Sequence, residues 1–380
     1  MRTDEKKRQA NNSVQPISKQ AQHRRIAVAL SGGVDSSVAA YLLKKEGHDV
    51  VGVTLKLQKS NGTKEDSSCC TNDSIQRARA AAEQLGIEHH VYDCAQEFDS
   101  KVLKPAWDEY NRGRTPSPCL MCNEQIKFGA LLSWAHSNGA SHLATGHYAQ
   151  KSSSPTGSPL LIRGADKNKD QSYFLAGLKR EQLESILFPI GHMTKPEIRA
   201  IARELGLNTA DTSESQDACL VSGDLSFAEI LRKRFDGETK PGPVLDESGS
   251  IVGSHEGIHH FTIGQRKGIH IQTTERCWVK SFNMENGGIT VTWNEENLLG
   301  EGFIARGVNW IEDQQNSALR ECTVQVRYRQ KPVPAVVRFS EQNTLSVNLK
   351  KPVRAITPGQ AAVFFDGARV LGRGWIYPPD

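Results

Sequence analysis

A seven-residue turn, Ser31-Gly32-Gly33-Val34-Asp35-Ser36-Ser37, constrains the fold of this chain more than any other feature. It follows an apolar run over residues 25–30 and precedes residues 37–45, whose apolar side chains recur with helical spacing. This order predicts a buried strand, a tight turn and a helix. The glycines let the backbone approach an anion closely, and the serine hydroxyls and first helical amides can hold phosphate oxygens.

The composition of this turn excludes one class of nucleotide loop. No lysine follows the glycines, so the turn is not a Walker A loop. Asp35 suits a neighbouring phosphate only if Mg²⁺ lies between the two charges. A plain strand-to-helix turn with a serine N-cap would explain Gly32, Gly33 and one serine, but not all seven residues in their order.

Strand-like and helix-like segments alternate along the first half of the chain. Apolar runs at residues 49–55, 88–93 and 142–145 predict strands, and residues 73–85 and 123–136 have helical spacing. Residues 194–197 (Thr-Lys-Pro-Glu) have the spacing of a capping box and predict another helix start. Alternating strands and helices predict an α/β fold with a parallel sheet covered on both faces.

The pattern changes after about residue 225, where glycine, proline and histidine become frequent and short strand-like runs replace helices. Alternating apolar residues at 323–328 and 335–339, and an Asp366-Gly367 turn, predict a small antiparallel barrel. The expected division is a disordered basic tail at 1–24, a nucleotide-binding catalytic domain at 25–225, a central domain at 226–298 and a C-terminal β-barrel at 299–380.

Composition places the chain in an ordinary class. The net charge is +4 and 37% of residues are hydrophobic, values typical of a globular protein. Residues 1–24 lack the apolar core of a signal peptide, and no apolar run is long enough to span a membrane. We therefore expect a reducing, cytoplasmic location, where most of the eight cysteines are packing residues and a minority are reactive.

Two polar segments contain the cysteines with the strongest chemical signal. Residues 115–123 hold Cys119-x-x-Cys122 in a proline-rich loop, with Cys122 at the expected start of a helix, where thiolate is favoured. The pair alone is compatible with a redox couple, half of a zinc site or two packed thiols. Residues 213–220 surround Cys219 with polar side chains, which suits an accessible, reactive thiol.

The turn at residues 31–37 resembles the PP-loop of the ATP-pyrophosphatase superfamily, which cleaves ATP between its α- and β-phosphates. Taken together with both cysteine segments, the chain from about residue 25 resembles the tRNA-specific 2-thiouridylases that act on the wobble uridine. Further matching motifs are Gly146-His147-Tyr148, Lys169-Asp170-Gln171-Ser172-Tyr173-Phe174, Gly191-His192, residues 261–268 (FTIGQRKG) and Arg327-Tyr328.

The resemblance implies a role for each matching residue. Cys122 would be the nucleophile and Cys219 would carry a persulfide, while the target base would contact Ser117, Pro118 and Cys119. The implied ATP-binding residues are Ala29, Leu30, Ser31, Gly32, Gly33, Val34, Asp35, Ser36, Leu55 and Gly146. The implied tRNA-binding residues are His147, Lys169, Asp170, Gln171, Arg327, Tyr328 and Gln360, and the central domain would also bind tRNA.

The sequence departs from this family at one chemically important point. Relatives often carry Asn-Pro-Asp where this chain has Ser117-Pro118-Cys119, so a thiol replaces a carboxylate near the base. Cys119, Cys122 and Cys219 could then bind a [4Fe–4S] cluster that leaves one iron free for sulfide. A smaller departure is Leu220, where relatives often have phenylalanine.

The resemblance also implies the reaction and its components. ATP with Mg²⁺ would adenylate the C2 oxygen of uridine, and sulfur would then replace that oxygen. The partners would be tRNA and a sulfur donor, either a cysteine desulfurase or a sulfur-relay protein. Two other interpretations are a PP-loop ligase with a different acceptor, which needs no paired cysteines, and a tRNA-binding protein without ATP turnover.

Overall fold

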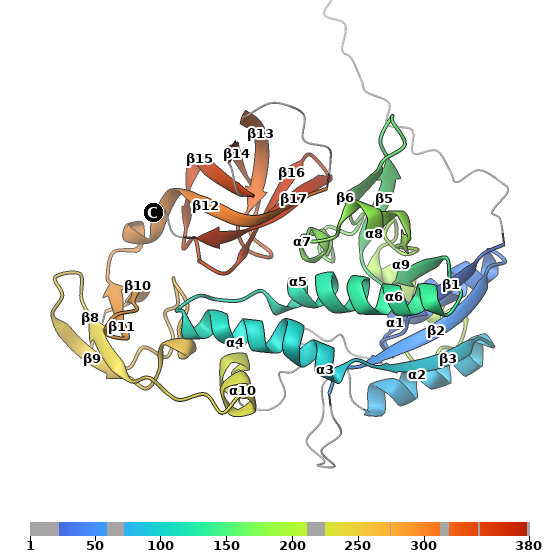
Figure 1. Ribbon diagram of the computed structural model, residues 1–380, viewed down its shortest axis with the longest axis horizontal. Coiled ribbons are helices and arrows are strands. Elements are labelled where there is room, and N and C mark those ends of the chain that lie inside the picture. The colour runs from blue at the N-terminus through green and yellow to red at the C-terminus, as the bar shows by residue number, and fades with distance from the viewer. Residues whose placement is uncertain are drawn as a thin grey trace, which may run out of the picture.

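The computed structural model describes residues 23–58, 72–210, 225–273, 275–311, 319–340 and 343–377. The predicted tail, except for residues 23 and 24, and the segment around Cys219 lie outside these ranges. In the described part, no helix is long and apolar enough to cross a membrane. The chain forms a parallel-sheet module, a small central module and a barrel (Figure 1).

The first module is built on five parallel strands in the order β3-β2-β1-β4-β7. Their bounds are β1 (Arg25–Ala29), β2 (Asp49–Lys56), β3 (Glu88–Asp93), β4 (His142–Thr145) and β7 (Ile186–Leu187). In β1, Ile26 and Val28 face one buried cluster and Ala27 faces the other. This alternation buries both faces of the sheet, which confirms the predicted parallel α/β fold.

Helices cover both faces of this sheet. One cluster includes side chains from α1 (Val34–Lys45), α2 (Asn72–Leu85) and α9 (Lys195–Glu204). The other is covered by a continuous helical rod made of α5 (Pro118–Cys122), the π-helical segment η2 (Asn123–Ala130) and α6 (Leu131–Ser137). A second rod, α3 (Ala95–Phe98), η1 (Asp99–Leu103) and α4 (Lys104–Asn111), packs beside it.

The rod containing the cysteines starts earlier than predicted. The sequence places its start at residue 123, whereas α5 begins at Pro118 with Ser117 as its N-cap. Proline at the first helical position has no amide hydrogen to lose and has a suitable φ, so it favours this start. Cys119 therefore lies in the first turn, and Cys122 lies one turn further in.

The barrel is the predicted C-terminal antiparallel structure. Pairing of β12 with β17 closes six strands in the order β12-β15-β14-β13-β16-β17. Their bounds are β12 (Leu299–Trp310), β13 (Leu319–Gln325), β14 (Val333–Ser340), β15 (Thr344–Arg354), β16 (Ala361–Asp366) and β17 (Arg369–Tyr377). A hairpin from the first module, β5 (Ala149–Ser153) and β6 (Pro159–Arg163), extends this sheet through β17.

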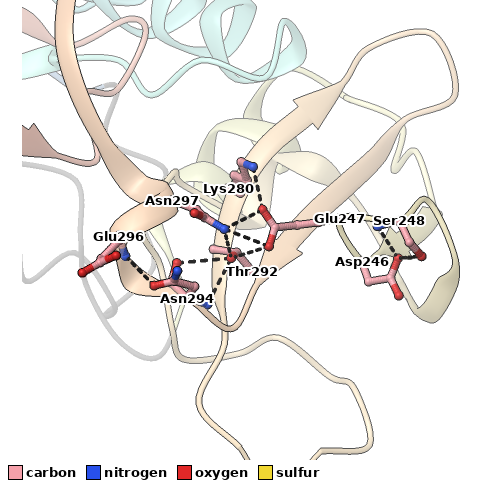
Figure 2. Close-up of polar contacts among 8 residues, drawn as sticks. All are labelled: Asp246, Glu247, Ser248, Lys280, Thr292, Asn294, Glu296 and Asn297. Atoms are coloured by element: carbon pink, nitrogen blue, oxygen red, sulfur yellow. Dashed lines mark hydrogen bonds and ion pairs between the residues drawn. The ribbon is translucent and has the colours of Figure 1, made fainter.

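The central module has four short strands in the order β10-β11-β8-β9: β8 (Gly242–Leu245), β9 (Ile251–His255), β10 (Trp278–Asn283) and β11 (Gly288–Thr292). The Glu247 carboxylate accepts hydrogen bonds from Lys280 at 2.6 Å, Thr292 at 2.8 Å and Asn297 at 2.9 Å (Figure 2). This network joins the β8–β9 turn to β10, β11 and η4 (Glu295–Leu298), because each donor comes from a different element.

Four short elements complete the description. The helix α10 (Phe227–Arg234) precedes the central module, and η3 (Ile258–His260) follows β9. Two further short helices, α7 (Ser172–Leu175) and α8 (Arg180–Glu184), lie between β6 and β7 in the chain.

Candidate active site

The glycine-rich turn lies at the carboxyl ends of neighbouring parallel strands. From β1 the chain moves outward to β2 and β3, then crosses back to β4 on the other side of β1. Such a reversal of strand order opens a crevice at the carboxyl edge, where open α/β sheets bind their ligands. Residues 31–36 after β1 and Gly146 after β4 both lie at this point.

Close backbone approach explains two of the glycines. Gly32 has φ +72°, and a Cβ atom there would lie 2.4 Å from the carbonyl oxygen of Ser74. A Cβ atom on Gly146 would lie 2.6 Å from the backbone nitrogen of Ser36. A side chain at Gly32 would therefore displace the turn or α2, and a side chain at Gly146 would displace the start of α1.

The serines of the turn hold its backbone in shape. Ser36 Oγ accepts from the Ser31 amide at 3.2 Å and donates to the Gly33 carbonyl at 3.0 Å. Ser37 Oγ donates to the same carbonyl at 3.1 Å. Gly33 is the N-cap of α1 and supplies no side-chain cap to the first helical amides. An uncapped helix start of this kind can serve as an anion site.

The other predicted ATP-binding residues frame the turn. Ala29 ends β1, while Leu30 and Val34 are buried beneath the loop. Leu55 is the second-last residue of β2 and is partly buried against the core. These side chains fix the position of the loop backbone.

Asp35 has two partners that the sequence did not indicate. Lys195 Nζ lies 2.8 Å from both carboxylate oxygens, and the Tyr148 hydroxyl donates to Oδ1 at 2.6 Å. Lys195 is 93% buried at the start of α9. The Thr194 capping box predicted that helix start but not the direction of the lysine. A cation therefore already balances the charge of Asp35.

Cys119 and Cys122, the two cysteines of residues 115–123, differ in exposure. Cys119 is exposed in the first turn of α5, whereas Cys122 is buried with Trp107 and Ile126. Residues three apart on a helix lie on the same side, so the two thiols share one face. Ser117 is buried at the N-cap. Cys219 lies outside the described residues.

Three other cysteines lack the properties of a nucleophile. Burial raises the pKa of Cys94 and of Cys322 to about 12, and burial also raises the pKa of Cys277. These groups stay protonated thiols at neutral pH, and thiolate is the reactive form.

The segment at residues 169–174 connects the nucleotide turn to the cysteine rod. The Tyr148 amide donates to Gln171 Oε1 at 3.0 Å, and Tyr148 also bonds Asp35. At the other end, Asn123 Nδ2 donates to the Phe174 carbonyl at 3.0 Å, directly after Cys122. The predicted tRNA residue Gln171 is thus part of the frame between the two halves of the site.

The remaining predicted tRNA residues are placed in different surroundings. Asp170 accepts from Arg163 at 2.7 Å and from two backbone amides, so it holds its own loop, while Lys169 beside it is partly exposed. The Tyr328 ring lies 4.3 Å from the Phe174 ring. Arg327 donates to Thr357 Oγ1 at 2.9 Å, and burial lowers the pKa of Arg327 from its usual value.

His147 lies in the core rather than on the surface. Its ring is 91% buried, contacts Phe128 and Phe188, and Nδ1 is 2.8 Å from Thr145 Oγ1. Burial lowers the pKa of His147 well below its usual value, so the imidazole is neutral. A direct cationic contact of His147 with a tRNA phosphate has no support in this geometry.

Acidification is expected to destabilise the fold through this histidine. Between the lowered folded pKa and about 6.5, the unfolded chain binds one more proton than the folded chain at His147. The free energy of unfolding should therefore fall by up to about 1.4 kcal/mol per pH unit below pH ~6.5 from this group. Urea unfolding of wild type and His147→Phe between pH 7.5 and 5 measures this slope. An equal slope in both proteins would contradict the assignment.

A separate cluster of possible metal ligands contains a carboxylate that is already paired with an arginine. In the described part of the chain, Glu229, His259 and His260 have ligand atoms within 4.8 Å of one another. However, Arg232 donates to both oxygens of Glu229 at 2.6–3.0 Å and holds the pKa of that carboxyl at about 2. The guanidinium already balances the charge a metal ion would neutralise.

Comparison with known proteins agrees with this geometry. Residues 24–223 match the family described as "tRNA methyl transferase HUP domain", residues 230–292 its PRC-barrel domain, and residues 300–376 the "aminomethyltransferase beta-barrel domain". The parallel sheet with a glycine-rich turn at its switch point thus defines a PP-loop protein with two accessory modules.

Curated relatives identify the family within this class. The chain is 42% identical to the tRNA-specific 2-thiouridylase MnmA of Geobacter metallireducens over 93% of its own length and 96% of that protein. It is 41% identical to MnmA 2 of Thermoanaerobacter sp. and 42% identical to MnmA of Synechococcus sp., covering 93% of this chain and 98% and 97% of those proteins. The chain belongs to the tRNA-specific 2-thiouridylase family.

Proposed function

We propose that this protein uses ATP to replace the C2 oxygen of the wobble uridine of tRNA with sulfur. The observation that carries the proposal is the frame formed by Tyr148, Gln171 and Phe174, which ties the phosphate-binding turn at Asp35 to the rod at Asn123, next to Cys122. An enzyme that adenylates a base and then delivers sulfur to the same carbon needs both sites held at a fixed separation.

In the first step, the C2 oxygen attacks the α-phosphate of ATP and pyrophosphate leaves. Amides at the start of α1 and the serine hydroxyls of the turn stabilise the phosphate charge, while Lys195 keeps the charge of Asp35 balanced beside the phosphates. Mg²⁺ would be bound through the phosphates of ATP. The base would reach the site near Ser117, Pro118 and Cys119 after leaving its stack.

In the second step, sulfur attacks C2 and AMP leaves with the original oxygen. We propose that the outer sulfur of a Cys219 persulfide makes this attack. The Cys122 thiolate then attacks the Cys219 sulfur, which releases 2-thiouridine and leaves a Cys122–Cys219 disulfide for an external thiol to reduce. In the other order, Cys122 attacks the persulfide first and the released hydrosulfide attacks C2. A desulfurase or sulfur-relay protein would load the persulfide.

The chemistry of Cys119 favours one alternative sulfur carrier. Its exposed thiol shares a helical turn with Cys122, so Cys119, Cys122 and Cys219 form a candidate ligand set for a [4Fe–4S] cluster. Anaerobically purified protein that contains no iron and still thiolates tRNA from a persulfide donor would eliminate this route.

The adenylation step has a direct isotopic test. With tRNA labelled with ¹⁸O at the C2 position of the wobble uridine, the label should appear in the phosphate of AMP, because the oxygen leaves with that phosphate. AMP without label, formed alongside 2-thiouridine, would show that C2 is activated in another way. A PP-loop ligase with a different acceptor would form unlabelled AMP and leave the labelled tRNA unchanged.

We further propose that residues 25–225 form the catalytic domain, residues 226–298 a tRNA-binding domain and residues 299–380 the barrel. The three separate sheets support this division, although the β5–β6 hairpin of the first domain pairs with barrel strand β17.

Removing the cation at Asp35 should impair the first step specifically. Lys195→Met leaves Asp35 with an unbalanced charge beside the phosphates, so we expect AMP formation to slow by about 10²-fold. Pyrophosphate release in the presence of tRNA measures this rate. Lys45→Met, at an exposed lysine in the last turn of α1, is the matched control and should keep the wild-type rate. Equal rates of pyrophosphate release in the two variants would show that Lys195 has no role in adenylation.

A further inference from the structure

The loop before α5, the helix that carries Cys119 and Cys122, is held by hydrogen-bond donors from another part of the chain. Residues 113–117 run from the end of α4 to Pro118, and Pro116 and Pro118 have no amide hydrogens. The carbonyl oxygens of Thr115 and Pro116 accept from one side-chain nitrogen, Gln360 Nε2, at 3.1 and 2.9 Å. A barrel residue thus binds two successive carbonyls directly before Ser117.

The backbone around Gln360 is itself held rigidly. The Thr115 amide donates to the Pro358 carbonyl at 2.9 Å, and a Cβ atom on Gly359, at φ +89°, would lie 2.8 Å from the Thr115 oxygen. The Ile376 amide in β17 donates to the Gln360 carbonyl at 2.9 Å, and Gly359 donates to the Ile376 carbonyl at 2.9 Å. The carboxamide therefore projects from a turn, directly before β16, that is hydrogen-bonded to β17.

The central module contacts the same loop from a different direction. Thr115 Oγ1 donates to Thr262 Oγ1 at 3.1 Å. A Cβ atom on Gly113, at φ +65°, would lie 2.7 Å from the sulfur of Met284. Both accessory modules therefore meet residues 113–117, and Gln360 supplies the two bonds nearest the predicted base-contact residues.

We propose that Gln360 is a positioning residue for the loop that carries Ser117, Pro118 and Cys119, and thereby sets where the target base meets Cys122. The family resemblance alone implies that Gln360 binds tRNA, whereas here its amide is already used on the loop. Both accessory modules would then couple tRNA docking to the geometry of sulfur transfer. This inference rests on the proposed thiolation activity.

The test compares Gln360→Glu and Gln360→Asn with wild type. Glutamate has the same shape but cannot donate to the two carbonyls when ionised, and asparagine keeps the donor one methylene too far away. Single-turnover thiolation at saturating tRNA should fall by about 10²-fold in Gln360→Glu, since small displacements near a reacting centre have effects of this size. The tRNA dissociation constant and the ATP dissociation constant should stay within about twofold of wild type.

The controls separate this role from other roles of the same residue. Gln96→Glu, at an exposed glutamine in α3, adds the same charge and should behave as wild type. A raised tRNA dissociation constant with an unchanged saturated rate would make Gln360 a tRNA contact and overturn the proposal. Wild-type rates in both Gln360 variants would also overturn it, as would a fall in melting temperature matched by equal losses of tRNA and ATP binding. Absence of 2-thiouridine in the wild-type reaction would instead refute the proposed function.

Discussion

Cys122→Ala and Cys219→Ala are each expected to slow 2-thiouridine formation by at least about 10³-fold, because each removes a group that makes or breaks a bond to sulfur. Adenylation does not use either thiol, so AMP formation in the presence of tRNA should continue in both variants. Digestion of the tRNA followed by mass spectrometry measures thiolation, and pyrophosphate release measures adenylation in the same sample.

The matched controls for this prediction are cysteines with inert thiols. Burial raises the pKa of Cys94 and Cys322 to about 12, so Cys94→Ala and Cys322→Ala should thiolate tRNA at the wild-type rate. Full thiolation by Cys219→Ala with a persulfide donor would contradict the persulfide route. Cys119→Asp, which restores the residue common in relatives, should keep activity in that route and lose it in the cluster route.

Arg373→Met is expected to destabilise the protein more than any surface substitution. Arg373 in β17 donates to both carboxylate oxygens of Glu124 at 2.7 Å. Glu124 lies two residues after Cys122 in the chain. The arginine is 95% buried, so its loss leaves a carboxylate without a counter-charge in the interior. Breaking a buried pair from one side costs about 3–5 kcal/mol, which denaturant unfolding of the purified variant would measure.

A double substitution separates the ion pair from its surroundings. Arg373→Met combined with Glu124→Gln should recover part of the loss, because no unpaired charge remains. The exposed pair of Lys350 and Glu321 is the control, and Lys350→Met should change the free energy of unfolding by less than about 1 kcal/mol. A similarly small effect of Arg373→Met would show that the barrel does not anchor the cysteine rod.

The parallel sheet could be predicted because its signals are local. Residues 25–30 are apolar and end at glycines, and Ile26, Ala27 and Val28 are fully buried on alternating faces. The Asp366-Gly367 turn likewise predicted the β16–β17 hairpin, whose register pairs Asp366 with Arg369. Hydrophobic periodicity and turn chemistry act over a few residues, so one sequence is enough to reveal them.

The contacts that complete the site could not be predicted in this way. Asp35 and Lys195 are 160 residues apart, and Gln360 meets Thr115 across 245 residues. A lysine in a capping-box segment and a glutamine in a barrel loop have no local pattern that indicates their partners. The family resemblance implied a tRNA contact for His147, but the packing of Phe128 and Phe188 buries its ring.

The most direct test of the central claim is a reaction of the full-length protein with unmodified tRNA, ATP with Mg²⁺ and a persulfide donor. The nucleosides are then digested and identified by mass spectrometry. The account predicts 2-thiouridine at the wobble position, formed only when ATP is present and in equal amount to AMP. AMP formation with no thiolated uridine from either a persulfide or a sulfide source would contradict it.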